Sequence, residues 1–349
     1  MEEVQRFNEI IKSFNIKADC IGFNKIRNVS MYDMFLTPGE RIKSISKYGE
    51  ELSLALKAKN KPIIKVVSEQ GIVRLEFIDS GSSLISYLDG IDNFGIDANN
   101  SFPMYLGENM DGKKIITNMS LDIHTIVAGS TGSGKSNYLH LLIANSLIFN
   151  NIDMFLVDTK NIEFSIYKDI FKNISVSTTY KETCEVLKFL ISEMEFRYQS
   201  MANKCVSDLK GLENKPKDIL FIIDEFSDLI LQDDSKELYN LLIKLTQKSR
   251  AARIFCVLAT QRPSVSVING MIKANMPSRV SFKVASNIDS RIILDASNGE
   301  LLSGNGDAII KNNNYNFERF QAAYVNPKEI IEFINNKKNI TNKRKKENE

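Results

Sequence analysis

The stretch HTIVAGSTGSGKSNYLHLLIANSLI occupies residues 124–148 and joins two kinds of pattern across one glycine-rich turn. Its first five residues form a short apolar run typical of a strand, and the residues after Ser136 have the length and apolar content of a helix. Between them, Gly129 to Ser136 fits the spacing G-x-x-x-x-G-K-[ST] of a phosphate-binding loop. A flexible Gly/Ser-rich loop is the alternative, but the flanking strand and helix favour phosphate binding.

The residue types of this loop match what a bound triphosphate needs. Glycines let the backbone turn its N–H groups inward, and the start of the following helix adds its dipole. Lys135 supplies a positive charge to the β- and γ-phosphates, and the hydroxyl of Ser136 is placed to bind Mg²⁺. The predicted nucleotide site consists of Gly129, Ser130, Thr131, Gly132, Ser133, Gly134, Lys135, Ser136 and Asn137.

A second motif, ILFIIDEFSDL at residues 219–229, places two carboxylates directly after an apolar run. We predict that Asp224 binds Mg²⁺ together with Ser136, and that Glu225 acts as general base on the attacking water. The alternative is an acidic pair that stabilises the start of a helix, but the phosphate loop upstream favours catalysis. The tetrapeptide N-K-x-D that marks GTP-binding proteins is absent, which favours ATP.

Apolar strands alternate with helices from about residue 120 onward. The pattern predicts a mainly parallel sheet covered by helices on both faces, and the fold class is therefore α/β, with a RecA-like P-loop NTPase domain. The predicted strands lie at residues 124–129, 153–158, 218–224 and 254–260.

Polar side chains follow several of these strands. Asp158 and Lys160 come after the second strand, and Gln261 and Arg262 come after the fourth. Because ligands of such sheets bind at the carboxyl ends of the strands, we expect these side chains to converge on the nucleotide. Gln261 is predicted to take part in catalysis by sensing the γ-phosphate or its water.

The chain divides into three predicted parts: a smaller α/β domain at 1–115, the P-loop domain at 116–330 and a basic disordered tail at 331–349. Residues 88–103, rich in Gly, Asn and Asp, are expected to link the two domains. The tail is interpreted as a solubilising terminus, with contact to DNA or lipid as the alternative. The elements predicted in the first part are helices at 2–14 and 40–58 and strands at 31–39, 62–67 and 72–78.

Composition narrows the class of protein. A net charge of +2 excludes a histone-like polycation, although a local groove of basic side chains can still bind nucleic acid. With two histidines, His124 and His140, a His-rich metal centre is excluded, and four widely spaced cysteines predict reduced thiols. No apolar run reaches the roughly 18 residues of a membrane span, and no signal peptide is recognised. We expect a cytoplasmic protein that reaches a membrane only through a partner.

Several stretches together resemble one known family, the FtsK/SpoIIIE DNA translocases. The stretches TPGERIKSISKYGEELSLAL and YLGENMDGKKIITNMSLDIHTIVAG are similar to the smaller α/β domain that precedes the family's motor. The stretches similar to the family's motor are, in order, HTIVAGSTGSGKS, LVDTKNIEFSIY, EMEFRY, FIIDEFSDLI and LATQRPSVSVINGMIKANMPSRVSFKVASNIDSRIILD. The resemblance covers roughly residues 30–325, and the last of these stretches is far more specific to the family than a P-loop is.

The resemblance implies an ATP-hydrolysing homohexameric ring with double-stranded DNA in its channel. ATP would lie between subunits, so that a neighbour donates an arginine to stabilise the transition state. The candidates for this arginine are Arg250, Arg279 and Arg291, and the sequence does not choose between them. Lys273 is a candidate phosphate contact to DNA, with a buried or a solvent-facing lysine as the alternatives.

The chain also departs from the family pattern. Full-length members carry transmembrane helices and often a winged-helix domain, which we do not recognise here, and Arg253 replaces a usual glycine. We therefore expect a stand-alone translocase in plasmid or mobile-element transfer, segregation or packaging. The alternatives are a type VII-like protein-secretion ATPase, whose chains usually hold several motor modules, and a nucleotide-gated DNA-binding protein, against which Glu225 argues.

Overall fold

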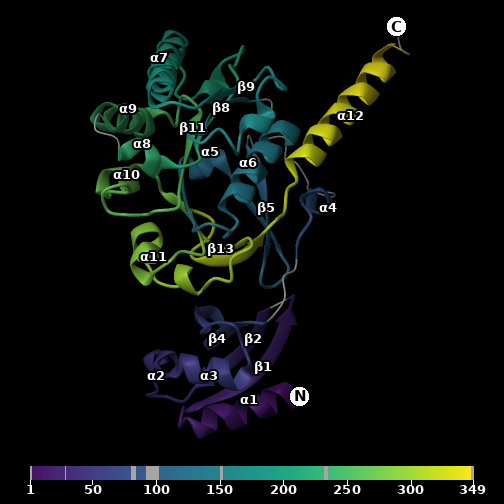
Figure 1. Ribbon diagram of the computed structural model, residues 1–349, viewed down its shortest axis with the longest axis vertical. Coiled ribbons are helices and arrows are strands. Elements are labelled where there is room, and N and C mark those ends of the chain that lie inside the picture. The colour runs from purple at the N-terminus through teal and green to yellow at the C-terminus, as the bar shows by residue number, and fades with distance from the viewer. Residues whose placement is uncertain are drawn as a thin grey trace.

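The computed structural model describes residues 2–27, 29–79, 84–91, 102–149, 152–231 and 235–346. Within these residues the chain forms a four-stranded sheet near the N-terminus and a ten-stranded sheet that carries the phosphate loop (Figure 1). Most of the linker predicted at 88–103 lies outside the described residues. No helix of the described chain is long and apolar enough to cross a membrane.

The four-stranded sheet is antiparallel, and its helices cover one face. Phe7 stacks on Tyr32 with ring centroids 4.1 Å apart, and Phe77 meets Tyr32 edge-on at 5.8 Å. Each such buried aromatic side chain stabilises the fold by about 1.5–3 kcal/mol. The strand order is β1 (Ala18–Ile26), β2 (Val29–Leu36), β4 (Ile72–Ile78), β3 (Ile63–Val67), and the helices are α1 (Glu2–Ser13), α2 (Ile42–Lys47) and α3 (Gly49–Leu56).

Two details of this unit differ from the sequence-based expectation. The helix predicted at 40–58 is two helices, α2 and α3, with Tyr48 between them in a non-helical conformation. Strand β1 was not predicted, because Gly22, Asn24 and Lys25 interrupt its apolar alternation. The segment is a strand because it pairs with β2 along its whole length, although its composition does not predict one.

The ten-stranded sheet is parallel on one side and antiparallel on the other. Its strand order is β6 (Lys114–Asn118), β5 (Pro103–Asn109), β14 (Glu318–Ala322), β13 (Asp307–Lys311), β12 (Ser278–Phe282), β7 (Thr125–Ala128), β11 (Ile254–Thr260), β10 (Ile219–Ile223), β8 (Asp153–Val157) and β9 (Ile174–Ser177). The six strands from β12 to β9 run parallel, as the alternation of strands and helices predicted.

Helices cover both faces of the parallel half. Alternate residues of β10 enter opposite cores: Leu220 packs on the side of α6 (Lys135–Phe149), and Phe221 packs on the side of α7 (Tyr180–Asn203). Burial on both faces explains why these strands are continuous apolar runs. The remaining helices are α4 (Tyr87–Ile91), α5 (Met119–Asp122), α8 (Phe226–Ile230), α9 (Ser235–Lys248), α10 (Gly270–Asn275), α11 (Asn287–Leu294) and α12 (Pro327–Lys346).

The antiparallel half was not predicted in detail. Strands β12 to β14 come late in the chain, yet they return to pair beside β7 and connect it to β5 and β6. The predicted boundary between residues 115 and 116 falls inside β6, a strand of the larger sheet. Where the chain divides into independent units stays a prediction.

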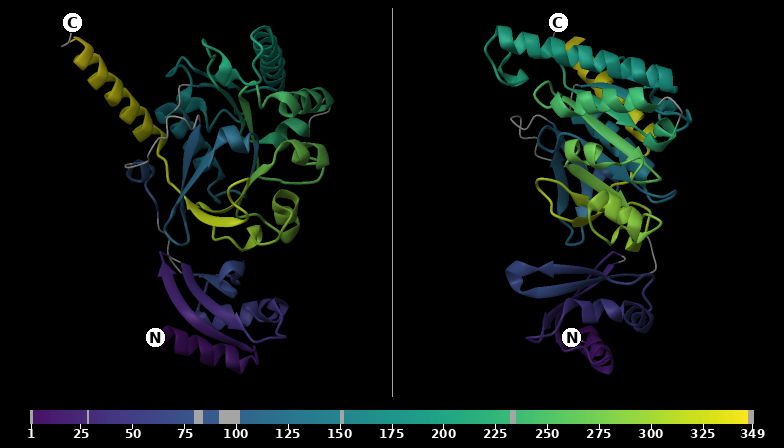
Figure 2. Two further views of the ribbon diagram at one scale, coloured as in Figure 1. Left: turned by 180° about the vertical axis from the view of Figure 1, so that it is seen from behind. Right: turned by 90° about the vertical axis from the view of Figure 1, so that its left-hand side faces the viewer.

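Helix α12 occupies most of the segment expected to be a disordered tail. Its first turns carry Ile330 and Ile334, which are buried against the larger sheet's core, and its backbone continues helical to Lys346. Figure 2 shows the helix extending away from the sheet. Packing at the start of the helix offsets the free-energy cost of forming its first turn, and each residue added after that turn gains one backbone hydrogen bond.

A buried arginine joins the two sheets. Arg319 of β14 donates to Glu76 of β4 at 2.9 Å and, with two nitrogens, to Asp307 of β13 at 2.9 Å. All three side chains are at most 4% exposed. One guanidinium therefore pairs with a carboxylate from each sheet, and the smaller sheet lies next to β13 and β14 (Figure 1).

Candidate nucleotide site

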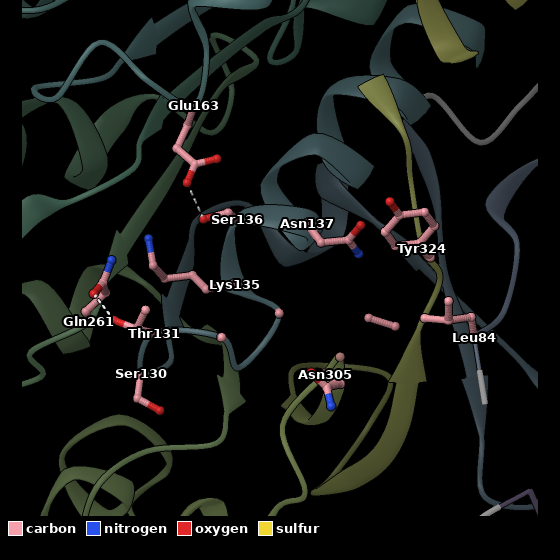
Figure 3. A pocket seen from close by; sticks show the side chains of 14 residues that line it. Leu84, Ser130, Thr131, Lys135, Ser136, Asn137, Glu163, Gln261, Asn305 and Tyr324 are labelled. Atoms are coloured by element: carbon pink, nitrogen blue, oxygen red, sulfur yellow. Dashed lines mark hydrogen bonds between the residues drawn. The ribbon is translucent and has the colours of Figure 1, made fainter. Parts of the chain in front are cut away.

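A cavity of about 560 Å³ opens at the carboxyl end of the parallel strands (Figure 3). Leu84, Glu163, Gln261, Tyr324 and the loop around Asn305 complete its wall. Of the nine residues predicted to bind nucleotide, the ones that line the cavity are Ser130, Thr131, Gly132, Gly134, Lys135, Ser136 and Asn137.

The glycines of the phosphate loop are required by its geometry. Gly132 and Gly134 have φ angles of 74° and 111°, a region that side chains disfavour. A Cβ on Gly129 would lie 2.4 Å from the Ser133 hydroxyl, and one on Gly134 would lie 2.6 Å from the backbone nitrogen of Gly306. A side chain at either position would clash with its surroundings, and Gly129 and Ser133 do not line the cavity.

Two neighbouring segments hold the loop in place. The backbone N–H and the hydroxyl of Ser130 both donate to the carbonyl of Lys283, at 2.8 and 2.9 Å. On the other side, the Gly306 N–H donates to the Ser133 carbonyl at 2.8 Å. Residues 303–306 were not predicted to contact the loop, although two glycines in four residues there are a signal of close backbone approach.

Lys135 and Asp224 form a buried ion pair in this structure. The Lys135 amine donates to the backbone carbonyl and to the carboxylate of Asp224, at 2.7 and 2.8 Å. Burial raises the pKa of the Asp224 carboxyl above its ordinary value, while Lys135 opposes that rise. Lys135 lines the cavity and Asp224 lies directly behind it, so a triphosphate on the loop would compete with Asp224 for the amine.

Glu225 is held in one orientation by several donors. Its carboxylate accepts hydrogen bonds from the hydroxyls of Ser227 and Thr260, at 2.6 and 2.7 Å, and from the backbone N–H of Gln261 at 3.0 Å. It precedes α8 but makes no capping bond with the helix. The end of β11 and Ser227 thus orient this carboxylate, and no hydrogen bond to the backbone of α8 does so.

Gln261 is the link between that strand end and the phosphate loop. Its side-chain oxygen accepts a hydrogen bond from the Thr131 hydroxyl at 3.0 Å, and its side chain lines the cavity. Its backbone, as above, donates to Glu225. Gln261 therefore contacts both the phosphate loop and Glu225, and its role as a γ-phosphate sensor stays a prediction. Arg262, by contrast, is exposed and does not line the cavity.

Glu163 is a residue that the sequence analysis quoted without assigning a role. Its carboxylate accepts a hydrogen bond from the Ser136 hydroxyl at 2.9 Å and lies 3.5 Å from His140 Nε2. Hydrogen bonding to His140, above all, lowers the pKa of the Glu163 carboxyl. Nδ1 of His140 is in turn 2.9 Å from the Tyr167 hydroxyl, so a chain of buried polar groups orients Glu163.

Asp158 and Lys160 do not converge on the cavity. Asp158 is fully buried and accepts the backbone N–H groups of Lys160 and Phe164, at 3.2 and 2.9 Å. The amine of Lys160 turns to Asp228, 3.7 Å away. Asp158 thus shapes the loop that carries Glu163 to the site. Glu163, five residues further along the chain, is the carboxylate of this loop that lines the cavity.

The oxygen ligands present fit a magnesium ion. The Ser136 hydroxyl and the carboxylates of Asp224 and Glu163 lie around the phosphate loop, and the charge of Glu163 contributes to the raised pKa of Asp224. Mg²⁺ is bound by few carboxylates and by phosphate oxygens rather than by a full set of protein ligands. Ser136 and Asp224 would hold the ion as predicted, and Glu163 adds a third oxygen donor.

The three candidate arginines differ in accessibility. Arg250 and Arg291 are exposed, whereas Arg279 pairs with Asp295 and is 11% exposed in its side chain. The amine of Lys273 also pairs with Asp295. None of these four basic side chains lines the cavity of its own chain among the described residues. Their roles toward a neighbouring subunit or DNA stay predictions.

Known proteins match most of the chain. The model of the FtsK/SpoIIIE family matches residues 96–218 and 210–265. A Haemophilus influenzae protein named DNA translocase FtsK is 31% identical over 369 residues, which cover 95% of this chain and 69% of that protein. A protein of the same name from Borreliella burgdorferi is 35% identical over 353 residues, covering 95% of this chain and 45% of the relative. The chain thus spans less than half of the Borreliella relative.

Solved structures share the fold. The pCW3 conjugation coupling protein TcpA, in its monomer form with ATPγS, superimposes with a TM-score of 0.67 at 20% identity, covering 95% of this chain and 99% of TcpA. The cytoplasmic domain of the type VII secretion ATPase EccC of Thermomonospora curvata gives a TM-score of 0.59 at 20% identity, covering 70% of this chain and 32% of EccC. The predicted α/β P-loop fold is confirmed.

Proposed function

The chain belongs to the FtsK/SpoIIIE family, and from this premise we propose that it is an ATP-dependent translocase of double-stranded DNA. The relatives from Haemophilus influenzae and Borreliella burgdorferi are named DNA translocases, and the resemblance spans almost the whole chain. The proposal comprises ATP and Mg²⁺ as cofactors, DNA as the substrate that is moved and a homohexameric ring as the working form.

One observation carries the enzymatic part of this proposal. The phosphate loop, Lys135 and Gln261 line one cavity. Directly behind them, Asp224 pairs with Lys135, and the buried carboxylate of Glu225 is held by Thr260 and the backbone of Gln261. A site for nucleotide binding alone has no need of a carboxylate that strand β11 orients. This arrangement supports hydrolysis over a nucleotide-gated binding protein.

The residues divide the chemistry between them. Lys135 binds and orients the β- and γ-phosphates, and the inward N–H groups of the loop bind the phosphate oxygens. Mg²⁺, when bound, supplies positive charge opposite the developing negative charge of the phosphates. Glu225 accepts the proton of the attacking water, and Thr260 and the Gln261 backbone keep its carboxylate aimed during the transfer.

The same strand end offers a route from the nucleotide to DNA. Gln261 is followed by the segment that leads to α10, where Lys273 lies. A change at Glu225 or at the phosphate loop reaches this segment through the two hydrogen bonds of Gln261. For the arginine donated between subunits, exposure favours Arg250 or Arg291 over Arg279, whose guanidinium is occupied by Asp295.

The setting of the reaction is also part of the proposal. We place the protein in the cytoplasm, in transfer or segregation of a plasmid or mobile element. All four cysteines are free, which fits a reducing compartment. TcpA, a structural neighbour that matches over 95% of this chain, is named a conjugation coupling protein. A membrane-bound partner would be needed for any action at a membrane.

The test is an ATPase assay of the full chain with and without double-stranded DNA. We expect DNA to stimulate turnover and Glu225→Gln to lower it by about 10²–10⁴-fold while ATP binding is retained. Glu185→Gln, an exposed substitution on α7, serves as the matched control and should leave turnover unchanged. Turnover that ignores DNA, or tight DNA binding without turnover, would overturn the proposal.

A further inference from the structure

The cavity has two chemically different ends. Thr131, Lys135 and Gln261 lie at one end, where the phosphates are expected. At the other end, beyond Asn137, Tyr324 and Leu84 face the cavity (Figure 3). Neither of these two residues was predicted to contact the nucleotide.

Tyr324 is aimed by the backbone on either side of it. Ala323 and Val325 are at most 3% exposed, whereas Tyr324 is 48% exposed, because successive side chains of an extended segment point to opposite sides. The Asn137 side chain donates to the Ala323 carbonyl at 2.8 Å and accepts the Val325 N–H at 2.9 Å. A residue of the helix behind the phosphate loop thus fixes the segment that presents the ring.

Leu84 reaches the same end through a short parallel bridge. The Tyr324 N–H donates to the Ile85 carbonyl at 2.7 Å, and the Tyr87 N–H donates to the Tyr324 carbonyl at 3.0 Å. These bonds hold the segment that begins at Leu84 alongside residue 324. Leu84 is 66% exposed, so an aliphatic and an aromatic side chain stand open together at one end of a phosphate-binding cavity.

We propose that Tyr324 and Leu84 hold the base of the nucleotide whose phosphates bind at the loop, an inference that rests on the proposed ATPase function of the cavity. An aromatic ring stacks on any nucleobase, and apolar walls with few polar groups are typical of small-molecule pockets. The phosphate loop and Lys135 contact only phosphates, and they therefore do not distinguish inorganic polyphosphate from the phosphates of a nucleotide. The Tyr324–Leu84 end is what distinguishes a nucleoside triphosphate from bare polyphosphate.

The proposal separates two kinds of ligand, and calorimetry with each can test it. The probes are ATPγS and inorganic tripolyphosphate, both with Mg²⁺ and without DNA. Tyr324→Ala should weaken ATPγS binding about tenfold or more and leave tripolyphosphate binding unchanged. Tyr324→Phe, which keeps the ring, should restore ATPγS binding. Phe196→Ala, an aromatic side chain that is 64% exposed on α7, is the matched control and should change neither affinity.

The possible results are distinguishable. If wild-type protein binds ATPγS no more tightly than tripolyphosphate, or if Tyr324→Ala weakens both ligands equally or neither, the base site is overturned while the phosphate site stands. If wild-type protein binds neither ligand, the proposed ATPase function fails, and the base site fails with it. Thermal unfolding of each variant, expected to match wild type because the backbone bonds of residue 324 remain, excludes a folding defect.

Discussion

Strand β10 carries an aspartate just outside each end, and each aspartate forms a buried ion pair. Asp218 precedes the strand and pairs with Arg253, and Asp224 follows it and pairs with Lys135. The two pairs belong to the same sheet and are equally hidden from solvent. They differ in how many hydrogen bonds the basic side chain forms with other side chains, and in whether it lines the cavity.

The pair at the amino end is closed. The guanidinium of Arg253 forms two hydrogen bonds with the carboxylate of Asp218, one of them at 2.7 Å, and a third with the Ser120 hydroxyl at 3.1 Å. Arg253 has a φ of 54°, in the left-handed region that favours glycine. A relative with glycine here would avoid that strain, and in this chain the pairing with Asp218 offsets it.

The pair at the carboxyl end is open. Lys135 has one carboxylate partner and lines the cavity, so that a phosphate group can take the place of Asp224. A compact ammonium group exchanges partners more readily than a planar guanidinium held by two bonds. In this sheet, a buried ion pair whose hydrogen bonds are all made within the protein stabilises the fold, whereas Lys135, which lines the cavity, remains available to a ligand.

The largest expected effect is at the closed pair. Arg253→Leu leaves Asp218 buried without its main partner and should lower the free energy of unfolding by about 3–5 kcal/mol, toward the lower value because Lys215 lies 3.3 Å from Asp218. Urea unfolding measures the loss. The double variant Arg253→Leu/Asp218→Leu should recover much of it, and a double variant no more stable than the single one would show that the pair is not the cause.

The next effect concerns pH at the same edge of the sheet. His124 lies between the Cys256 N–H and the Ser249 hydroxyl, and burial lowers its pKa from 6.5 to about 4. The unfolded chain therefore binds more protons between these values, and stability is lost as pH falls through that window. We expect a loss of about 2.5 kcal/mol from His124 on going from about pH 7 to about pH 4.5.

The variant His124→Gln isolates this contribution. Glutamine retains an acceptor and a donor but does not titrate, so the unfolding free energy of the variant should depend less steeply on pH across the same window. Equal slopes for variant and wild type would mean that other groups cause the acid sensitivity.

A smaller change in stability is expected at the open pair. Lys135→Ala removes hydrogen bonds to a charged group and should lower the free energy of unfolding by about 1.5 kcal/mol. The loss is limited because water in the cavity can then reach Asp224. Nucleotide binding should be lost, as calorimetry with ATPγS would measure. Lys160→Ala, which removes a more exposed lysine, is the control. A stability loss as large as that of Arg253→Leu would remove the distinction between the two ends.

The smallest effect on stability is expected for Gln261→Ala. It deletes one hydrogen bond to Thr131, worth about 0.5 kcal/mol, and leaves the phosphate loop and Glu225 in place. ATP binding should be retained while DNA translocation is lost. Displacement of a triplex-forming strand from the DNA measures the translocation. A variant that translocates normally would show that the end of β11 plays no part in coupling.

Much of the P-loop half could be predicted because its signals are local. The spacing of residues 129–136, the apolar runs and the carboxylates after β10 each depend on neighbours in sequence. Strand β1, strands β12 to β14 and the start of helix α12 depend on partners far along the chain. Without those partners their compositions are ambiguous, and for this reason they were not predicted.

The P-loop, the two carboxylates that follow β10 and the resemblance to the family could be predicted, because each depends on short motifs whose residues are neighbours in the sequence. Only the tertiary structure decided that Glu163, rather than Asp158, reaches the cavity, and that Asn137 positions the segment of Tyr324. These contacts join residues from 27 to more than 180 positions apart. Such distances are closed by strand order and packing, and no local pattern encodes them.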